Sequence, residues 1–96
     1  MNHQQILRQA LAARNDEVLT YQINIDNYTA AIASIDANYA DNANLAQFRA
    51  DLANRLQVER EQQLRSIVIR DVIAAQVKPL PLWRRAIAAL PFTGTP

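Results

Sequence analysis

The residues of this 96-residue chain that could do acid–base or nucleophilic chemistry are few and far apart. His3 is the only histidine, and it lies beside the N-terminus, where side chains are usually solvated. There is no cysteine, and the two serines, Ser34 and Ser66, fall inside segments with a helical pattern. No glycine-rich loop precedes a helix to hold a phosphate group. The sequence therefore predicts no catalytic residue, no cofactor-binding site and no enzymatic activity.

Carboxylates occur as two close pairs, Asp16 with Glu17 and Glu59 with Glu61. Iron and manganese sites in helical bundles combine such residues with a Glu-x-x-His spacing on paired helices. That spacing does not occur in this sequence. We interpret both pairs as parts of solvated helix faces, and the sequence predicts no metal site.

Four arginines recur at intervals of five residues, at Arg55, Arg60, Arg65 and Arg70. Five residues advance about 140° around a helix, so these side chains spread over several faces instead of forming one basic stripe. Carboxylates between them weaken the positive field further. Nucleic acid is therefore an unfavoured partner, although a Rop-like hairpin dimer that binds RNA remains an alternative.

The elements that position these residues are helices, because the two strongest helix breakers are missing from most of the chain. The single glycine is Gly94, and the four prolines lie at or after Pro79. The run SIVIRDVI (66–73) could form a buried strand, but no nearby segment could pair with it, so a helix is favoured. No window is apolar enough to span a membrane, and no secretory signal is evident, so an all-α protein without a membrane segment is expected.

The first half of the chain has a heptad pattern that is typical of a coiled-coil seam. Its a and d positions are Leu7, Leu11, Arg14, Val18, Tyr21, Ile25, Tyr28, Ile32, Ile35 and Tyr39. This pattern predicts a helix over residues 3–40. A turn is expected over 41–44, because the side chains of Asp41, Asn42 and Asn44 compete for backbone hydrogen bonds and cap helices.

A second helix is expected over residues 45–77. Its first turns present four apolar residues on one side, namely Leu45, Phe48, Leu52 and Leu56. The two halves of the chain have opposite net charge. Residues 1–43 have two arginines against five carboxylates (−3), and residues 44–96 have eight basic residues against four acidic ones (+4). The sequence thus predicts a long antiparallel helical hairpin, resembling a coiled coil, over residues 1–77.

Folding this hairpin about residue 42 pairs positions whose numbers sum to about 84. On that register Ile35 faces Phe48 or Arg49. Arg14, the one charged residue of the first seam, falls opposite Asp71. We predict an Arg14–Asp71 ion pair that fixes the register, since a partly buried pair adds specificity more than stability.

Residues 78–96 are expected to form a proline-containing tail. The first two prolines end the second helix, because proline lacks an amide donor and pushes its predecessor toward extended conformations. A short helix is predicted over 82–90. It places three apolar residues on one face with an arginine beside them: Trp83, Ile87, Leu90 and Arg84.

Several apolar residues lie off the predicted seam. With the tail helix, they make up the expected partner-binding residues: Leu19, Ile23, Val68, Ile69, Val72, Trp83, Arg84, Ile87 and Leu90. A two-helix rod is marginally stable by itself, because each helix has only one neighbour. We therefore expect self-association into a helical bundle or docking on a larger protein.

The run YQINIDNYTAAI (21–32), followed by a polar turn and a charged helix, resembles small uncharacterised helical proteins encoded by tailed bacteriophages. The resemblance covers residues 18–77. It implies a virion accessory or assembly factor, such as a tail or tail-fibre chaperone or an adaptor between larger subunits. It also implies a location in the host cytoplasm or the virion. An inhibitor of a host protein, comparable to an antitoxin, is an alternative role for the same hairpin.

Overall fold

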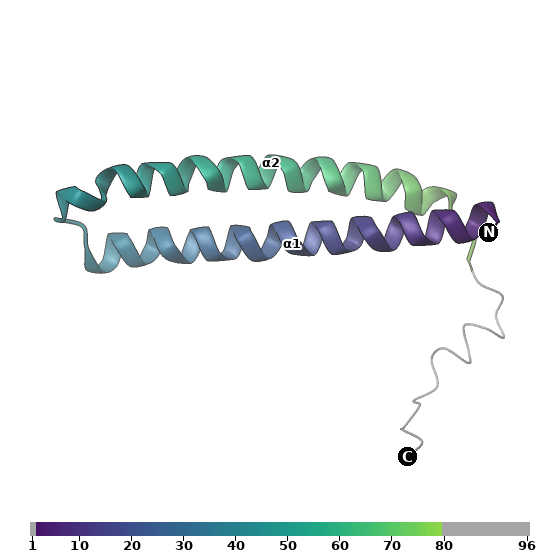
Figure 1. Cartoon of the computed structure of the whole chain (residues 1–96), viewed down its shortest axis with the longest axis horizontal. Coiled ribbons are helices and arrows are strands. Elements are labelled where there is room, and N and C mark those ends of the chain that lie inside the picture. Colours follow the sequence, from purple (N-terminus) through teal and green to yellow (C-terminus); the bar gives the residue numbers. More distant parts are fainter. Residues whose placement is uncertain (1, 80–96) are drawn as a thin grey trace, which may run out of the picture.

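The computed structural model describes residues 2–79, which form two long helices packed antiparallel as an extended hairpin (Figure 1). Helix α1 spans His3–Asn38, a single 3-10 turn (η1) spans Ala43–Leu45, and α2 spans Ala46–Gln76. The predicted all-α hairpin is confirmed, and the run over 66–73 is helical. The helix expected over 82–90 lies outside the described residues.

Helix α1 begins where the chain provides its own hydrogen-bond partners for the first free amides. The backbone N–H of Gln5 donates to the Asn2 side chain at 2.8 Å, and the N–H of Asn2 donates to the Gln5 side chain at 2.9 Å. This reciprocal capping box satisfies two amides that have no partner within the helix. The sequence prediction of the start of this helix did not use that signal.

The turn forms at the asparagine cluster, as expected from its residue types. Helix α1 ends at Asn38, two residues before the predicted end, and the N–H of Tyr39 still bonds to the carbonyl of Ile35 at 2.8 Å. The Asn42 side chain accepts from the N–H of Asn44 at 3.0 Å and caps the 3-10 turn. Tyr39, the last predicted seam position, therefore lies at the end of the seam and is exposed.

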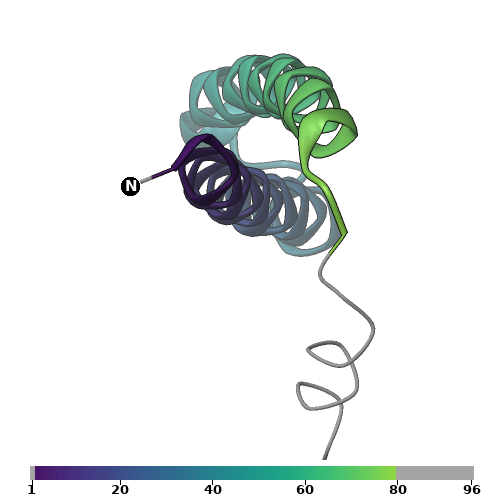
Figure 2. The ribbon, with the colours of Figure 1, turned by 90° about the vertical axis from the view of Figure 1, so that its right-hand side faces the viewer.

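The core of the hairpin is one line of side chains between the two helices. Only four hydrophobic residues within the described range are buried: Leu7, Ile25, Ile35 and Leu52. No side chain of residues 2–79 is completely buried. Figure 2, viewed along the long axis, shows α1 and α2 side by side, so each helix packs against one neighbour. The hairpin therefore leaves much of its apolar surface uncovered.

Side-chain contacts at both ends of the hairpin define its register. Near the turn, the Arg49 guanidinium donates two hydrogen bonds to the Asp36 carboxylate, at 2.6 and 2.9 Å. At the open end, the backbone N–H of Lys78 donates to the Gln4 side chain at 2.8 Å. Both pairs follow the predicted register, in which facing residue numbers sum to about 84. The helices are thus aligned over their whole length.

Candidate docking surface

The side of α2 that faces α1 is polar in its middle. Buried and half-buried residues recur from Leu45 onward at alternating intervals of four and three, which is a heptad pattern. These seam positions are Leu45, Arg49, Leu52, Leu56, Glu59, Gln63, Ser66, Arg70, Ile73 and Val77. Four successive positions from Glu59 to Arg70 are therefore polar, opposite an α1 seam that is mostly apolar.

Hydrogen bonds across the interface hold this polar section. The Gln63 side-chain amide donates to the Gln22 side chain at 2.8 Å and to the backbone carbonyl of Val18 at 3.2 Å. The Asn24 amide donates to the Glu59 carboxylate at 3.3 Å. Within residues 2–79 there is no buried side-chain nitrogen or oxygen that lacks a partner. The polar seam is thus satisfied, which removes the main cost of burying polar groups.

Because polar residues occupy this section of the seam, several apolar residues of α2 point away from α1. Leu64, Val68 and Val72 are 62%, 55% and 57% exposed. They are four residues apart, so they lie above one another on one helix face. Val68 is two residues from both Ser66 and Arg70, which is about 200° around the helix, so it points away from the seam. We call Leu64, Val68 and Val72 the outer stripe.

The outer stripe continues into a neighbouring apolar residue. Ile69, which is 41% exposed, lies beside it, and Leu64, Arg65, Val68 and Ile69 line a shallow hollow. Of the residues predicted to bind a partner, the structure therefore brings Val68, Ile69 and Val72 together. Leu64 belongs to the same exposed group, although the sequence analysis did not count it among the partner-binding residues.

The other predicted partner residues on α1 lie elsewhere. Leu19 and Ile23 are more than half exposed, and Ile23 is two residues from the seam positions Tyr21 and Ile25. They therefore face away from α2, at the opposite edge of the hairpin. The predicted partner-binding residues of the two helices therefore lie on two separate edges of the hairpin. Trp83, Arg84, Ile87 and Leu90 lie outside the described residues.

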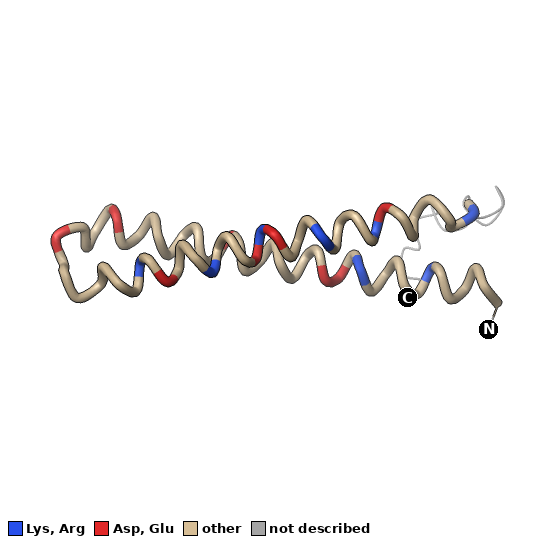
Figure 3. The backbone as a smooth tube through the Cα atoms, turned by 90° about the horizontal axis from the view of Figure 1, so that it is seen from above, with Lys and Arg blue, Asp and Glu red and all other residues tan. Residues whose placement is uncertain are grey.

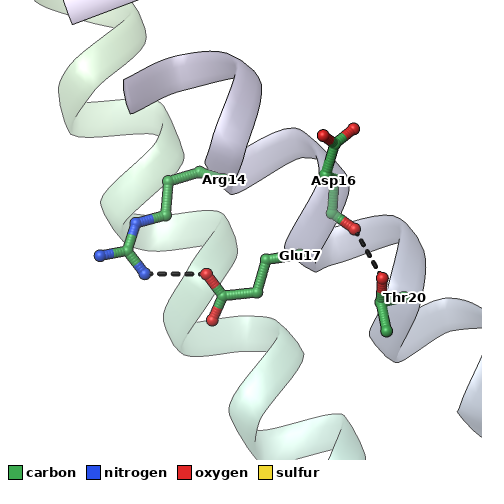
Figure 4. A network of polar contacts seen from close by, with 4 residues as sticks. All are labelled: Arg14, Asp16, Glu17 and Thr20. Atoms are coloured by element: carbon green, nitrogen blue, oxygen red, sulfur yellow. Dashed lines mark hydrogen bonds and ion pairs between the residues drawn. The ribbon is translucent and has the colours of Figure 1, made fainter. Parts of the chain in front are cut away.

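The predicted Arg14–Asp71 ion pair is not formed. Arg14 pairs with Glu17 on its own helix at 2.9 Å (Figure 4), and Asp71 pairs with Arg70 at 3.2 Å. The seam position opposite Arg14 is Arg70, so Asp71 falls one residue outside the seam and its side chain is 64% exposed. Each arginine is therefore neutralised within its own helix.

A cross-helix ion pair does occur near the turn, where Asp36 meets Arg49. The two hydrogen bonds from Arg49 lower the pKa of the Asp36 carboxyl, and the same contact raises the pKa of Arg49. The register rule places these two residues at the same level of the hairpin, which is the one sequence signal that pointed to the pair. Of the two residues predicted to face Ile35, Arg49 occupies that position. Phe48 points outward and is half exposed.

Phe48 instead contributes to an open depression on the surface. Together with Tyr28, Leu52 and Arg55, it lines a hollow of about 580 Å³. Its walls are formed by only two helices, and it is open to solvent. We assign it no separate function.

Charged residues are interspersed along both helices (Figure 3). Arg55, Arg60 and Arg65 are exposed but point in different directions, as their five-residue spacing requires. A protein that follows a phosphate backbone needs such residues on one side. This distribution does not favour the RNA-binding alternative.

Among residues 2–79, no three His, Cys, Asp or Glu side chains are grouped closely enough to hold a metal ion. Neither helix has a stretch long and apolar enough to cross a membrane.

The geometry therefore leaves the outer stripe of α2 and the Leu19–Ile23 edge of α1 as the candidate binding surfaces. Comparisons of the chain with protein-family models, curated proteins and solved structures found no match.

Proposed function

We propose that the chain is a non-enzymatic adaptor that binds another protein through the outer stripe of α2. The observation that supports this is the orientation of α2, which places polar residues against α1 and leaves Leu64, Val68 and Val72 in solvent. Covering the exposed parts of three such side chains would stabilise a complex by roughly 2–4 kcal/mol. An amphipathic helix face of this kind fits a groove or a second helix on a partner.

We further propose that the partner is a larger subunit of a phage virion or of its assembly pathway. The chain would then act as a tail or tail-fibre chaperone or as an adaptor between subunits, in the host cytoplasm or the virion. The support is the resemblance of residues 21–32 to helical phage proteins. An elongated hairpin with two apolar edges also suits a position between two larger proteins.

The test is the mass of the purified protein in solution, measured by light scattering, alone and after co-expression with the proteins encoded beside it. We expect a stable complex with a larger protein, or a defined oligomer. Val68→Glu places a charge on the outer stripe and should abolish the complex. Gln9→Glu adds the same charge at an exposed position of α1 and should leave it intact.

A chain that stays monomeric and fully helical and takes up no partner would contradict the proposal. A tight one-to-one complex with a host enzyme would instead favour the inhibitor alternative. Ile23→Glu tests whether the α1 edge contributes to binding, because it should weaken the complex only if the partner also contacts α1.

A further inference from the structure

Each helix has a second heptad row on the side that faces away from the other helix. On α1, exposed residues recur at alternating intervals of four and three: Ala12, Asp16, Leu19, Ile23, Asp26, Ala30, Ala33 and Ala37. On α2, the corresponding exposed residues are Asn54, Val58, Glu61, Arg65, Val68, Val72 and Ala75. We call these rows the α1 edge seam and the α2 edge seam. Residues at this spacing are the ones with which a helix packs along a second helix.

The two edge seams point in opposite directions. Ile23 and Val68 each lie about 180° around their helix from the seam between α1 and α2. Because α1 and α2 lie side by side (Figure 2), the two rows form opposite edges of the hairpin. A second copy in the same orientation, moved sideways, therefore brings its α1 edge seam against the α2 edge seam of the first copy.

One register matches the two edge seams along their length. Facing residues of antiparallel helices have numbers with a constant sum, and a sum of about 91 aligns the two heptad rows. The facing pairs are then Asp16–Ala75, Leu19–Val72, Ile23–Val68, Asp26–Arg65, Ala30–Glu61, Ala33–Val58 and Ala37–Asn54. Each large apolar side chain of both rows meets an apolar residue. We propose that copies of this chain bind one another in this way, edge to edge.

Charge selects this register. Asp26 and Arg65 are exposed, and the ion pairs of residues 2–79 include neither of them. One oxygen of Asp26 accepts a hydrogen bond from the Gln22 side chain at 2.9 Å, and the other is not used by that bond. Arg65 also lies four residues after Glu61, and its five donors can serve both carboxylates. A register one helical turn away, with a sum of about 87, would instead place Asp26 against Glu61, two like charges.

Symmetric contacts between two copies satisfy fewer of these residues. Two α1 edge seams that pair Leu19 with Ile23 would bring Asp16 against Asp26. Two paired α2 edge seams would leave Leu19 and Ile23 in solvent. The edge-to-edge contact is head-to-tail, and a head-to-tail contact between copies in the same orientation does not close on itself. It therefore covers both edges of every copy within a row of hairpins.

The size of the contact indicates how strong the association is. It extends over about 22 residues of each helix, or roughly 32 Å. Its five large apolar side chains are each more than half exposed in the single hairpin: Leu19, Ile23, Val58, Val68 and Val72. One contact between two helices is small compared with the roughly 1,200–2,000 Å² of stable specific interfaces. We therefore expect reversible association that increases with protein concentration.

This inference rests on the proposed function, because it requires the outer stripe to be a protein-binding surface. It adds that a second copy of the chain is one protein that the stripe binds. The copy at each end of a row keeps one free edge, and that edge is the surface on which a larger partner would dock.

Two single variants of the full chain test the head-to-tail geometry. Ile23→Asp blocks the α1 edge and Val68→Asp blocks the α2 edge, both at exposed positions, so far-UV circular dichroism should stay helical. In analytical ultracentrifugation, the wild-type mass should rise with concentration, and each variant alone should remain a monomer of 10.8 kDa. An equal mixture of the two variants should form one-to-one dimers, because each variant keeps the edge that the other has lost.

The remaining outcomes of this experiment contradict the proposal. Ile23→Asp that dimerises alone would show a symmetric α2–α2 contact, and Val68→Asp that dimerises alone would show an α1–α1 contact. A wild type that stays monomeric at all concentrations would overturn the proposal, and so would a mixture that stays monomeric where the wild type associates.

Exchange of charges tests the register. Asp26→Arg and Arg65→Asp should each weaken the self-association severalfold, because each brings like charges together. The double variant Asp26→Arg/Arg65→Asp should restore it, because the two charges are then exchanged. Asp41→Arg, at the turn, changes the net charge as much as Asp26→Arg does and should leave the association unchanged. A double variant that is no better than the single variants would overturn the proposed pairing.

The proposed function and this inference can fail separately, because Asp26→Arg leaves the outer stripe intact. A chain that is always monomeric but binds a larger partner through Val68 would reject the self-association alone. A chain that associates edge to edge but takes up no larger partner would reject the adaptor role alone.

Discussion

At the residue scale, stability depends on a few side chains that face the partner helix. Ile25 is buried in the seam, whereas Ile23, two residues earlier, is half exposed on the far side of the same helix. The two residues are chemically identical, so they form a matched pair. Their different surroundings follow from the 200° that separates them around the helix.

We predict that Ile25→Ala lowers the free energy of unfolding by about 2–3 kcal/mol, because it leaves a cavity in a core that has few other contacts. Ile23→Ala should cost less than about 1 kcal/mol. Urea denaturation followed by circular dichroism measures both. Equal losses for the two variants would mean that the seam is not where the structure places it.

The Asp36–Arg49 pair predicts a specific dependence on pH. The folded-state pKa of Asp36 lies below its usual value of 3.8, so the ionised carboxylate stabilises the hairpin at neutral pH. This stabilisation is lost as the pH falls through the folded-state pKa. Below about pH 4 the melting temperature of the wild type should therefore fall more steeply than that of Asp36→Asn. Asp41→Asn removes the same charge without the pair and should keep the wild-type steepness; identical profiles for all three proteins would contradict the role of the pair.

At the scale of the elements, the sequence was sufficient for the two helices and their turn. Residues 2–78 lack glycine and proline, the α1 heptad is nearly continuous, and the asparagine cluster marks the reversal. The rotation of α2 was harder to predict, because its apolar residues from Leu64 to Val72 occupy more than one face. A helix is rigid, so the phase set near the turn by Leu45, Leu52 and Leu56 continues along the rod and brings polar residues into the seam.

The same limit explains the wrong Arg14–Asp71 pair. The register rule gives the level at which two residues meet, but it does not give their angle around each helix. One residue of difference, between Arg70 and Asp71, changes that angle by about 100°. Asp36 and Arg49 satisfy both conditions and form the pair that the sequence rule did not single out.

We predict that the polar seam of α2 reduces the stability of the hairpin. Gln63→Leu should raise the free energy of unfolding by about 1 kcal/mol, because a half-buried position facing an apolar seam gains apolar contact. Its hydrogen-bond partner Gln22 is exposed, so water can replace the lost bond. Gln57→Leu, at an exposed position, should change little. Urea denaturation that shows destabilisation by Gln63→Leu would indicate that the hydrogen bonds of this section matter more than the packing.

At the scale of the whole molecule, the hairpin is long and thin. Helix α1 alone has 36 residues and extends about 54 Å, yet the described chain buries four hydrophobic side chains. Such a structure gains stability from a partner that covers its edges. The proposed function depends on the orientation of α2. Its polar side faces α1, and its outer stripe is left free to contact another protein.

A disulfide test in the cysteine-free chain measures this orientation directly. Val18 and Ser66 occupy facing seam positions, whereas Ile23 and Val68 lie on opposite edges. We predict that Val18→Cys with Ser66→Cys closes rapidly within one chain, and that Ile23→Cys with Val68→Cys does not close within one chain. Rapid intramolecular closure of the second pair, with none of the first, would contradict the orientation of α2 and the docking surface that depends on it.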